Sequence, residues 1–152
     1  MKIFTTVGTT SFDLLIKSVD EFAATNKDND FIFQIANGQF HPRNGCYFRF
    51  ENDIVHYYEW ADVVITHAGA GTIYKLLEQR KKVIIVPNLV RIDKHQRDIA
   101  QYMCDHHYSL VLWDLSSLSS IMKDIEKFSP AVYKKTPFFR SDEIVNFINN
   151  IR

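Results

Sequence analysis

The stretch DVVITHAGAGTIYKLLEQRKKVIIVPN, residues 62–88, decides the fold class of this chain. It holds two continuous apolar runs, 62–66 and 82–86, joined by a segment that reads as a helix. Continuous apolar strands are typical of the middle of a parallel sheet, where both faces are covered. A strand, a helix and a second strand in this order indicate a βαβ unit, and hence an α/β fold.

The rest of the chain repeats this alternation. Hydrophobic periodicity predicts further strands at residues 2–7, 31–35, 47–50 and 109–113. It predicts helices at residues 12–23, 94–106, 118–125 and 141–151, with Asp114 or Ser116 as the cap of the third; residues 54–60 remain ambiguous. We therefore expect a single Rossmann-like, doubly wound parallel sheet over residues 1–137 and a separate C-terminal helix within residues 138–152.

The composition is that of one folded domain. The 152 residues are 46% hydrophobic and 24% charged. Lys plus Arg and Asp plus Glu each number 18, so bulk charge gives no reason to expect nucleic-acid binding. No apolar run approaches the roughly 18 residues of a membrane span, and the start MKIFTTVGTT is unlike a signal peptide. Cys46 and Cys104 match no metal-ligand spacing, and we expect a cytoplasmic protein without a metal or cofactor.

Ligands of doubly wound sheets bind at the carboxyl ends of the strands. The first loop there is Gly8-Thr9-Thr10-Ser11, whose hydroxyls suit either phosphate oxygens or an ordinary helix cap at Thr10 or Ser11. The second is His67-Ala68-Gly69-Ala70-Gly71-Thr72. Its small residues open a helix, where unpaired N–H groups favour a diphosphate; tight packing of strand against helix is the alternative.

The third loop, residues 87–96, ends in the polar cluster Asp93-Lys94-His95-Gln96 and also contains Asn88. Asp93 suits a helix cap, whereas Gln96 and His95 suit hydrogen bonds to sugar hydroxyls. None of the three loops is the G-x-G-x-x-G dinucleotide fingerprint or a P-loop. The second predicted strand also ends without a carboxylate for a ribose, which argues against a dinucleotide-dependent oxidoreductase.

Three blocks, VGTTSFDLL, ADVVITHAGAGTI and IIVPN followed by DKHQ, together resemble the C-terminal, donor-binding domain of the glycosyltransferase 28 family. The resemblance covers roughly residues 1–113. It extends to the short stand-alone members: the catalytic subunit of the two-part N-acetylglucosaminyltransferase of the dolichol pathway, and bacterial counterparts in capsule or exopolysaccharide synthesis. It implies one half of a GT-B architecture, whose other half is a membrane-anchored partner subunit that receives a lipid-linked saccharide.

The resemblance also implies roles for individual residues. The candidate substrate-binding residues are Gly8, Thr9, Thr10, His67, Ala68, Gly69, Ala70, Gly71, Thr72, Asn88, Asp93, His95 and Gln96. The two glycine loops would hold the diphosphate of a UDP-sugar, and Gln96 would contact the sugar. Lys75 stands where relatives carry an acidic residue, and since lysine cannot accept a hydrogen bond, ribose recognition must differ.

An inverting transfer to an acceptor hydroxyl needs a general base. Among the six histidines, His67 and His95 lie in candidate loops, and the partner subunit is the other candidate source of the base. The C-terminal helix, with its apolar face, would dock that partner and so bring the enzyme to the membrane periphery. The alternative function is a non-catalytic module that binds a nucleotide sugar and regulates or scaffolds a neighbouring enzyme.

Overall fold

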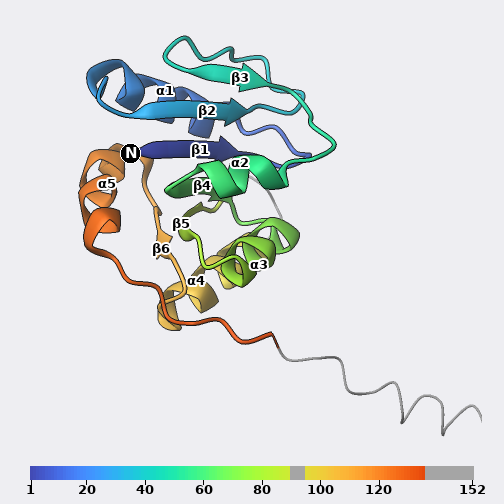
Figure 1. Ribbon diagram of the computed structural model, residues 1–152, viewed down its shortest axis with the longest axis vertical. Helices are drawn as coiled ribbons and strands as arrows, with labels where there is room; N and C mark the ends of the chain where they lie inside the picture. The colour runs from blue at the N-terminus through green and yellow to red at the C-terminus, as the bar shows by residue number, and fades with distance from the viewer. Residues whose placement is uncertain (90–94, 136–152) are drawn as a thin grey trace, which may run out of the picture.

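The computed structural model describes residues 1–89 and 95–135. Its strands form one sheet in the order β3-β2-β1-β4-β5-β6, and every neighbouring pair is parallel (Figure 1). The strands are β1 (Lys2–Thr6), β2 (Asp30–Gln34), β3 (Cys46–Phe48), β4 (Val63–His67), β5 (Lys82–Val86) and β6 (Leu110–Val111). The predicted doubly wound α/β sheet is therefore confirmed. The helix expected within residues 138–152 lies outside the described residues, as does Asp93.

Helices cover both faces of the sheet. The helices are α1 (Asp13–Thr25), α2 (Val55–Trp60), α3 (Ala70–Glu78), α4 (His95–Asp105) and α5 (Leu118–Lys127), with a 3-10 turn, η1, at Leu115–Ser117. The side chains of α1 and α5 pack on one face, and those of α2, α3 and α4 pack on the other. The ambiguous stretch 54–60 is thus a short helix within the crossover from β3 to β4.

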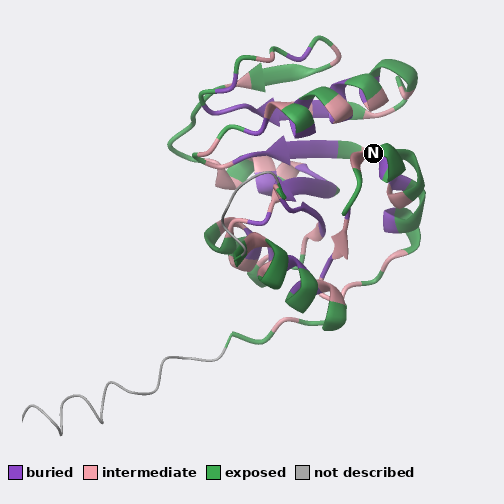
Figure 2. Cartoon of the chain, turned by 180° about the vertical axis from the view of Figure 1, so that it is seen from behind, coloured by how far each residue is buried: buried purple, intermediate pink, exposed green. Residues whose placement is uncertain are grey.

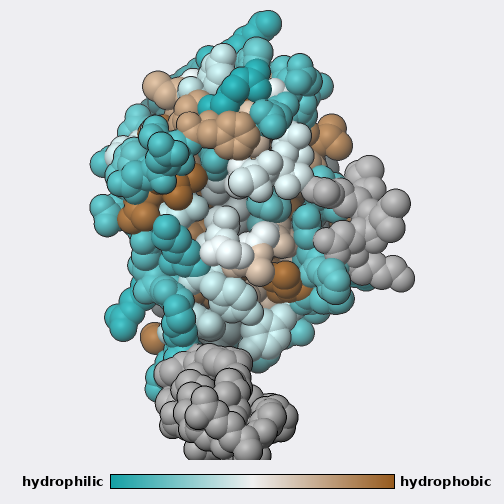
Figure 3. Space-filling view, turned by 90° about the vertical axis from the view of Figure 1, so that its right-hand side faces the viewer, coloured by the Kyte–Doolittle hydropathy of each residue, from teal (hydrophilic) through white to brown (hydrophobic). Residues whose placement is uncertain are grey.

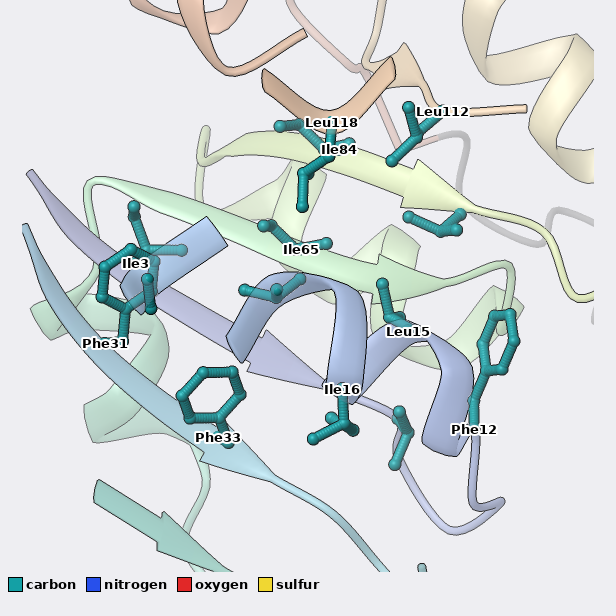
Figure 4. Packing of buried hydrophobic residues seen from close by; sticks show 14 of the residues in the cluster. Ile3, Phe12, Leu15, Ile16, Phe31, Phe33, Ile65, Ile84, Leu112 and Leu118 are labelled. Atoms are coloured by element: carbon teal, nitrogen blue, oxygen red, sulfur yellow. The ribbon is translucent and has the colours of Figure 1, made fainter. Parts of the chain in front are cut away.

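The alternation of strand side chains divides the core into two clusters. Ile3, Ile65 and Ile84 face α1 and α5, and Figure 4 shows them packed with residues of those helices and of β2. Phe4 and Val64, each next in sequence to one of these, face α2 and α3. Figure 2 shows the central strands buried and the outer sides of the helices exposed. Burial on both faces explains why the central strands read as continuous apolar runs.

The two edge strands differ from their predicted bounds. The aromatic run around β3 lies at an exposed edge, where Cys46 and Tyr47 are accessible, so no buried face fixes its register in the sequence. At the other edge, β6 is cut short because Asp114 begins η1, accepting a hydrogen bond from the Ser116 amide at 3.0 Å. That bond holds the pKa of Asp114 below its ordinary value. Asp114 thus caps η1, whereas α5 begins after Ser117 without a side-chain cap, so neither Asp114 nor Ser116 caps the helix predicted at 118–125.

Two adjacent lysines close helix ends at the amino edge of the sheet. Lys81 Nζ donates to the carbonyls of Glu59 and Ala61, each at 3.0 Å, at the end of α2. Lys82 Nζ donates to the carbonyls of Ile125 and Glu126, at 3.0 and 2.8 Å, in the last turn of α5. Carbonyls in the last turn of a helix lack partners within the helix, and a lysine ammonium satisfies them.

The loop between β2 and β3 is held by one buried carboxylate. Asp20 of α1 is 6% exposed, and its Oδ1 accepts hydrogen bonds from the amides of Arg43 and Asn44 at 2.9 and 2.7 Å. The Asn44 side chain donates back to the Asp20 carbonyl at 3.2 Å. This reciprocal contact ties α1 to a loop that lacks other regular structure.

Replacing Asp20 with alanine should therefore destabilise the domain by about 2 kcal/mol, because two loop amides lose a charged acceptor. Urea denaturation measures this loss. The matched control is Glu21→Ala, since Glu21 is exposed and its pair with Lys17 is long, at 3.9 Å. Equal losses in the two variants would show that the buried carboxylate does not hold the loop.

Candidate functional site

The order of the strands places the site. Strands β2 and β3 lie on one side of β1, whereas β4, β5 and β6 lie on the other, so the chain reverses its direction of winding between β1 and β4. Ligands of doubly wound sheets bind at the carboxyl edge of such a switch point. The strand ends there are in register, with Thr6 of β1 opposite Thr66 of β4. The loops that follow them are the first two predicted loops.

The His67 ring brings these two loops together. A Cβ atom added at Gly8 would lie 3.1 Å from His67 Cε1 and 3.9 Å from Thr72 Oγ1. A Cβ atom added at Gly69 would lie only 2.7 Å from His67 Nε2. Gly8 has a φ of +59°, in the left-handed region that glycine adopts without strain. Both glycines are thus needed for packing against an imidazole.

Gly71 differs from the other two glycines. A Cβ atom added there would meet nothing within 4 Å, and both Ala70 and Gly71 are exposed. These residues form the first turn of α3, whose cap residue Gly69 makes no side-chain capping bond and whose first turn has no acidic residue. The amides of a first turn have no partner within their helix, and the helix dipole makes this end positive. The turn is therefore chemically suited to an anion.

The first loop offers less to a ligand than its sequence indicates. The Gly8 amide donates to Thr6 Oγ1 at 3.1 Å, and the Thr10 amide donates to the Val7 carbonyl at 3.2 Å. Thr9 between them is exposed, and its amide makes no hydrogen bond to the described residues. Helix α1 begins after Phe12 without a side-chain cap. The expectation that Thr10 or Ser11 caps this helix was therefore wrong.

The third loop has an internal link of its own. The Asn88 amide donates to Gln96 Oε1 at 3.0 Å, which ties the end of β5 to the first turn of α4. Gln96 is half-buried, and His95 beside it is exposed. Because the sheet is parallel, Asn88 and Gln96 lie at the same edge as the first two loops, the edge that faces the viewer in Figure 3. The sugar contact predicted for Gln96 stays a prediction.

Tyr58 is a neighbour of the site that the sequence did not reveal. Its ring is buried beneath α3, and burial raises the pKa of its hydroxyl, partly offset by a hydrogen bond with the Thr72 side chain. Lys75 lies over this ring, with Nζ 5.9 Å from the ring centroid. Tyr57 and Tyr58 are adjacent in the ambiguous stretch 54–60, and the sequence gave no sign of which ring would face α3. The first turn of α3 thus rests on a tyrosine of α2.

The described residues contain no group of three or more His, Cys, Asp and Glu side chains that would hold a metal ion. Cys46 and Cys104 are free thiols. None of the helices in the described part of the chain has the length and apolar character needed to cross a membrane. Among the described residues, the candidate ligand-binding features are the exposed first turn of α3 and the loops beside it.

A single parallel sheet with this strand order and an open helix start at its switch point defines a Rossmann-like α/β domain. Residues 2–137 match the family described as glycosyltransferase family 28 C-terminal domain, and the chain belongs to that family. The human UDP-N-acetylglucosamine transferase subunit ALG13 is 34% identical over 113 residues. That match covers 66% of this chain and 10% of the human protein, so the chain spans a small part of that relative.

Solved structures share the fold. The NMR solution structure of ALG13 superposes with a TM-score of 0.62 at 20% identity, covering 91% of this chain and 92% of that one. The crystal structure of MurG from Acinetobacter baumannii superposes with a TM-score of 0.62 at 19% identity, covering 82% of this chain but only 41% of that one. The domain thus corresponds to one half of a GT-B glycosyltransferase.

The different surroundings of Gly69 and Gly71 lead to opposite effects on stability. Gly69→Ala should destabilise the domain by about 1–3 kcal/mol, because its methyl group would displace the His67 ring that is already packed against Gly8. Gly71→Ala should stabilise it by up to about 1 kcal/mol, since the methyl group meets no atom and alanine favours the helix. Urea denaturation of both variants measures these changes. Changes of the same sign would contradict the packing described for His67.

Proposed function

We propose that this chain is the donor-binding and catalytic subunit of a two-component glycosyltransferase. It would move a sugar from a UDP-sugar to a lipid-linked acceptor in polysaccharide or oligosaccharide synthesis, including capsule or exopolysaccharide. The observation that carries this proposal is the first turn of α3, which is uncapped, lacks an acidic residue and is open at Gly71. Membership of glycosyltransferase family 28 supports a sugar nucleotide as the anion.

The chemistry of transfer explains why such a turn is useful. An oxygen of the acceptor hydroxyl attacks C1 of the sugar, the bond from C1 to the UDP oxygen breaks, and the acceptor proton passes to a base. Negative charge then grows on the departing diphosphate. The amides of Ala70 and Gly71, and the Thr9 amide across the switch point, are fixed donors that stabilise this charge without reorganising. The proposed mechanism uses no metal ion or cofactor.

The chain offers few candidates for the general base. The His67 ring is packed between Gly8 and Gly69, a position that suits a residue setting the distance between the two loops. His95 is exposed at the start of α4 and is the chain's own candidate for the base. We propose that the partner subunit completes the site and supplies the base or orients the acceptor toward it.

An exposed apolar hollow beside the site supports a partner subunit. Its volume is about 230 Å³, and it lies between the ends of β5 and β6 and the start of α1. Leu14, Leu89 and Trp113 line it and are 58%, 56% and 40% exposed. Figure 3 shows hydrophobic patches among polar side chains on this edge. Apolar residues gathered at the rim of a site are typical of a surface that another protein covers.

The last described residues leave the domain from the face of α3 and α4. Tyr133 contacts the rings of Tyr74 and Tyr108, with centroids 5.5 and 5.6 Å away, and Lys135 pairs with Glu78 at 2.9 Å. The following residues, 138–152, are proposed as the partner-docking helix. Docking to a membrane-anchored partner would hold the chain on the cytoplasmic side of the membrane.

UDP should raise the melting temperature of this chain, and NAD should not. At a UDP concentration one hundred times the dissociation constant, the gain in the free energy of unfolding is about 2.7 kcal/mol. Gly71→Ala should reduce this gain although it stabilises the free domain, because its methyl group fills the space where the diphosphate would approach the backbone. Thermal denaturation with each nucleotide measures both effects. Stabilisation by NAD alone would overturn the proposed function.

Turnover separates the enzyme from a non-catalytic module that binds the same nucleotide sugar. The assay combines the chain, its partner, a labelled UDP-sugar and a lipid acceptor. Gln96→Ala should abolish transfer while the domain remains folded by circular dichroism. Loss of transfer in this folded variant rejects the scaffold alternative, whereas full activity removes Gln96 from the donor site.

Association with the partner should depend on the apolar hollow. Leu14→Asp should weaken the complex about tenfold or more by placing a charge in a buried contact, while the fold tolerates an acidic residue in the first turn of α1. Val132→Asp is the matched control, because Val132 is 59% exposed but lies away from the hollow. Dissociation constants from surface plasmon resonance compare the two. Equal affinities would show that the hollow is not the interface.

A further inference from the structure

Gln34 is a buried polar residue that the site as described above does not use. It is the last residue of β2 and is 4% exposed. Its Nε2 donates to the Gly8 carbonyl at 3.2 Å, and its Oε1 accepts from Thr6 Oγ1. A buried carboxamide must find such partners, and here both lie at the end of β1 or in the loop that follows it.

These bonds close into a ring. The Gly8 amide donates to Thr6 Oγ1 at 3.1 Å, and the same hydroxyl donates to Gln34, which in turn donates to the Gly8 carbonyl. Both backbone groups of Gly8 are therefore held by side chains from two neighbouring strands. This ring of hydrogen bonds holds Gly8 at a φ of +59°, although a glycine can adopt several other values of φ.

Burial alone does not account for this ring. Thr5 and Thr66 are fully buried at the same strand ends, yet neither hydroxyl has a hydrogen-bond partner among the described residues. The fold thus tolerates buried hydroxyls without partners at this edge. By contrast, the polar atoms of the Thr6 and Gln34 side chains all have partners, at the point where the chain turns toward the His67 ring. A Cβ atom added at Gly8 would lie 3.1 Å from Cε1 of that ring.

We infer that Gln34 is a positioning residue for the donor site. Directly at the Gly8 carbonyl, and through Thr6 at the Gly8 amide, it fixes the peptide groups of Gly8, and so sets where the Thr9 amide and the His67 ring lie beside the first turn of α3. The inference rests on the proposed function, because the group to be positioned is the diphosphate of the donor. Neither Gln34 nor Thr6 touches the donor in this arrangement, and both act through Gly8.

A pair of threonine variants tests the inference. Thr6→Val replaces a hydroxyl by a methyl group of similar size and breaks two bonds of the ring. Thr5→Val makes the same change at an equally buried neighbour on the opposite face of β1, where no bond is lost. Isothermal titration with UDP should show Thr6→Val weakened about ten- to hundredfold, the range that misplaced binding groups produce. Thr5→Val should bind like the wild type.

Two further variants separate positioning from simple stability. Thr6→Ser keeps the hydroxyl and should restore UDP binding. Gln34→Glu keeps the shape and accepts from Thr6, but its ionised carboxylate cannot donate to the Gly8 carbonyl, so its UDP affinity should fall at a pH where this carboxyl is ionised. Urea denaturation gives the fraction folded for each variant. If Thr6→Val only lowers stability, and its folded fraction binds UDP as the wild type does, the inference is overturned.

NMR spectra of the chain without nucleotide provide a readout independent of binding. In Thr6→Val and Gln34→Glu, the amide signals of Gly8 and Thr9 and the ring signals of His67 should shift, whereas Thr5→Val should leave them in place. Unchanged signals in Thr6→Val would overturn the inference. Failure of the wild type to bind UDP would instead count against the proposed function, and the NMR comparison would still decide whether the ring holds the loop.

Discussion

The contact of the His67 ring with two glycine backbones is the constraint on which the site depends. Strands β1 and β4 are hydrogen-bonded neighbours, so the loops after them must pass each other at close range. The imidazole fills the space between them, and side chains at Gly8 or Gly69 would collide with it or crowd it. The His67 imidazole thereby sets the distance between the two loops, and the first turn of α3 is left open beside it.

The hydrophobic pattern of the sequence was sufficient for the centre of the fold and insufficient for its edges. The runs at 62–66 and 82–86 predicted β4 and β5 within one residue, because a strand buried on both faces has few alternatives. The strands β3 and β6 shifted or shortened, because an exposed edge imposes no pattern on its residues. The stretch 54–60 was left undecided, since the six residues of its helix, Val55–Trp60, span too few turns for helical periodicity to emerge.

The loops of the candidate site were predicted in their place at the strand ends, whereas the packing of their glycines was not. Strand ends and a switch point follow from the alternation of strands and helices, so the loops at Gly8 and His67 were found. A glycine that admits a ligand and a glycine that admits a neighbouring ring look the same in a sequence, and only Gly71 proved open. Gln34 was missed because its partners lie 26 and 28 residues away, a pairing that local pattern does not encode.

The lysine bonds at the amino edge of the sheet have a consequence for how this domain attracts anions. The run Arg80-Lys81-Lys82 has the composition of a phosphate-binding or membrane-binding patch, yet two of its three ammonium or guanidinium groups are already committed to main-chain oxygens of α2 and α5. The last turns of α2 and α5 are therefore satisfied at one pole of the molecule. At the other pole α1 and α4 carry Asp13 and Asp98 in their first turns, whereas the first turn of α3 has no acidic residue. In a chain with no net charge, this contrast confines the positive end of an uncompensated helix dipole to the start of α3 among these three helices.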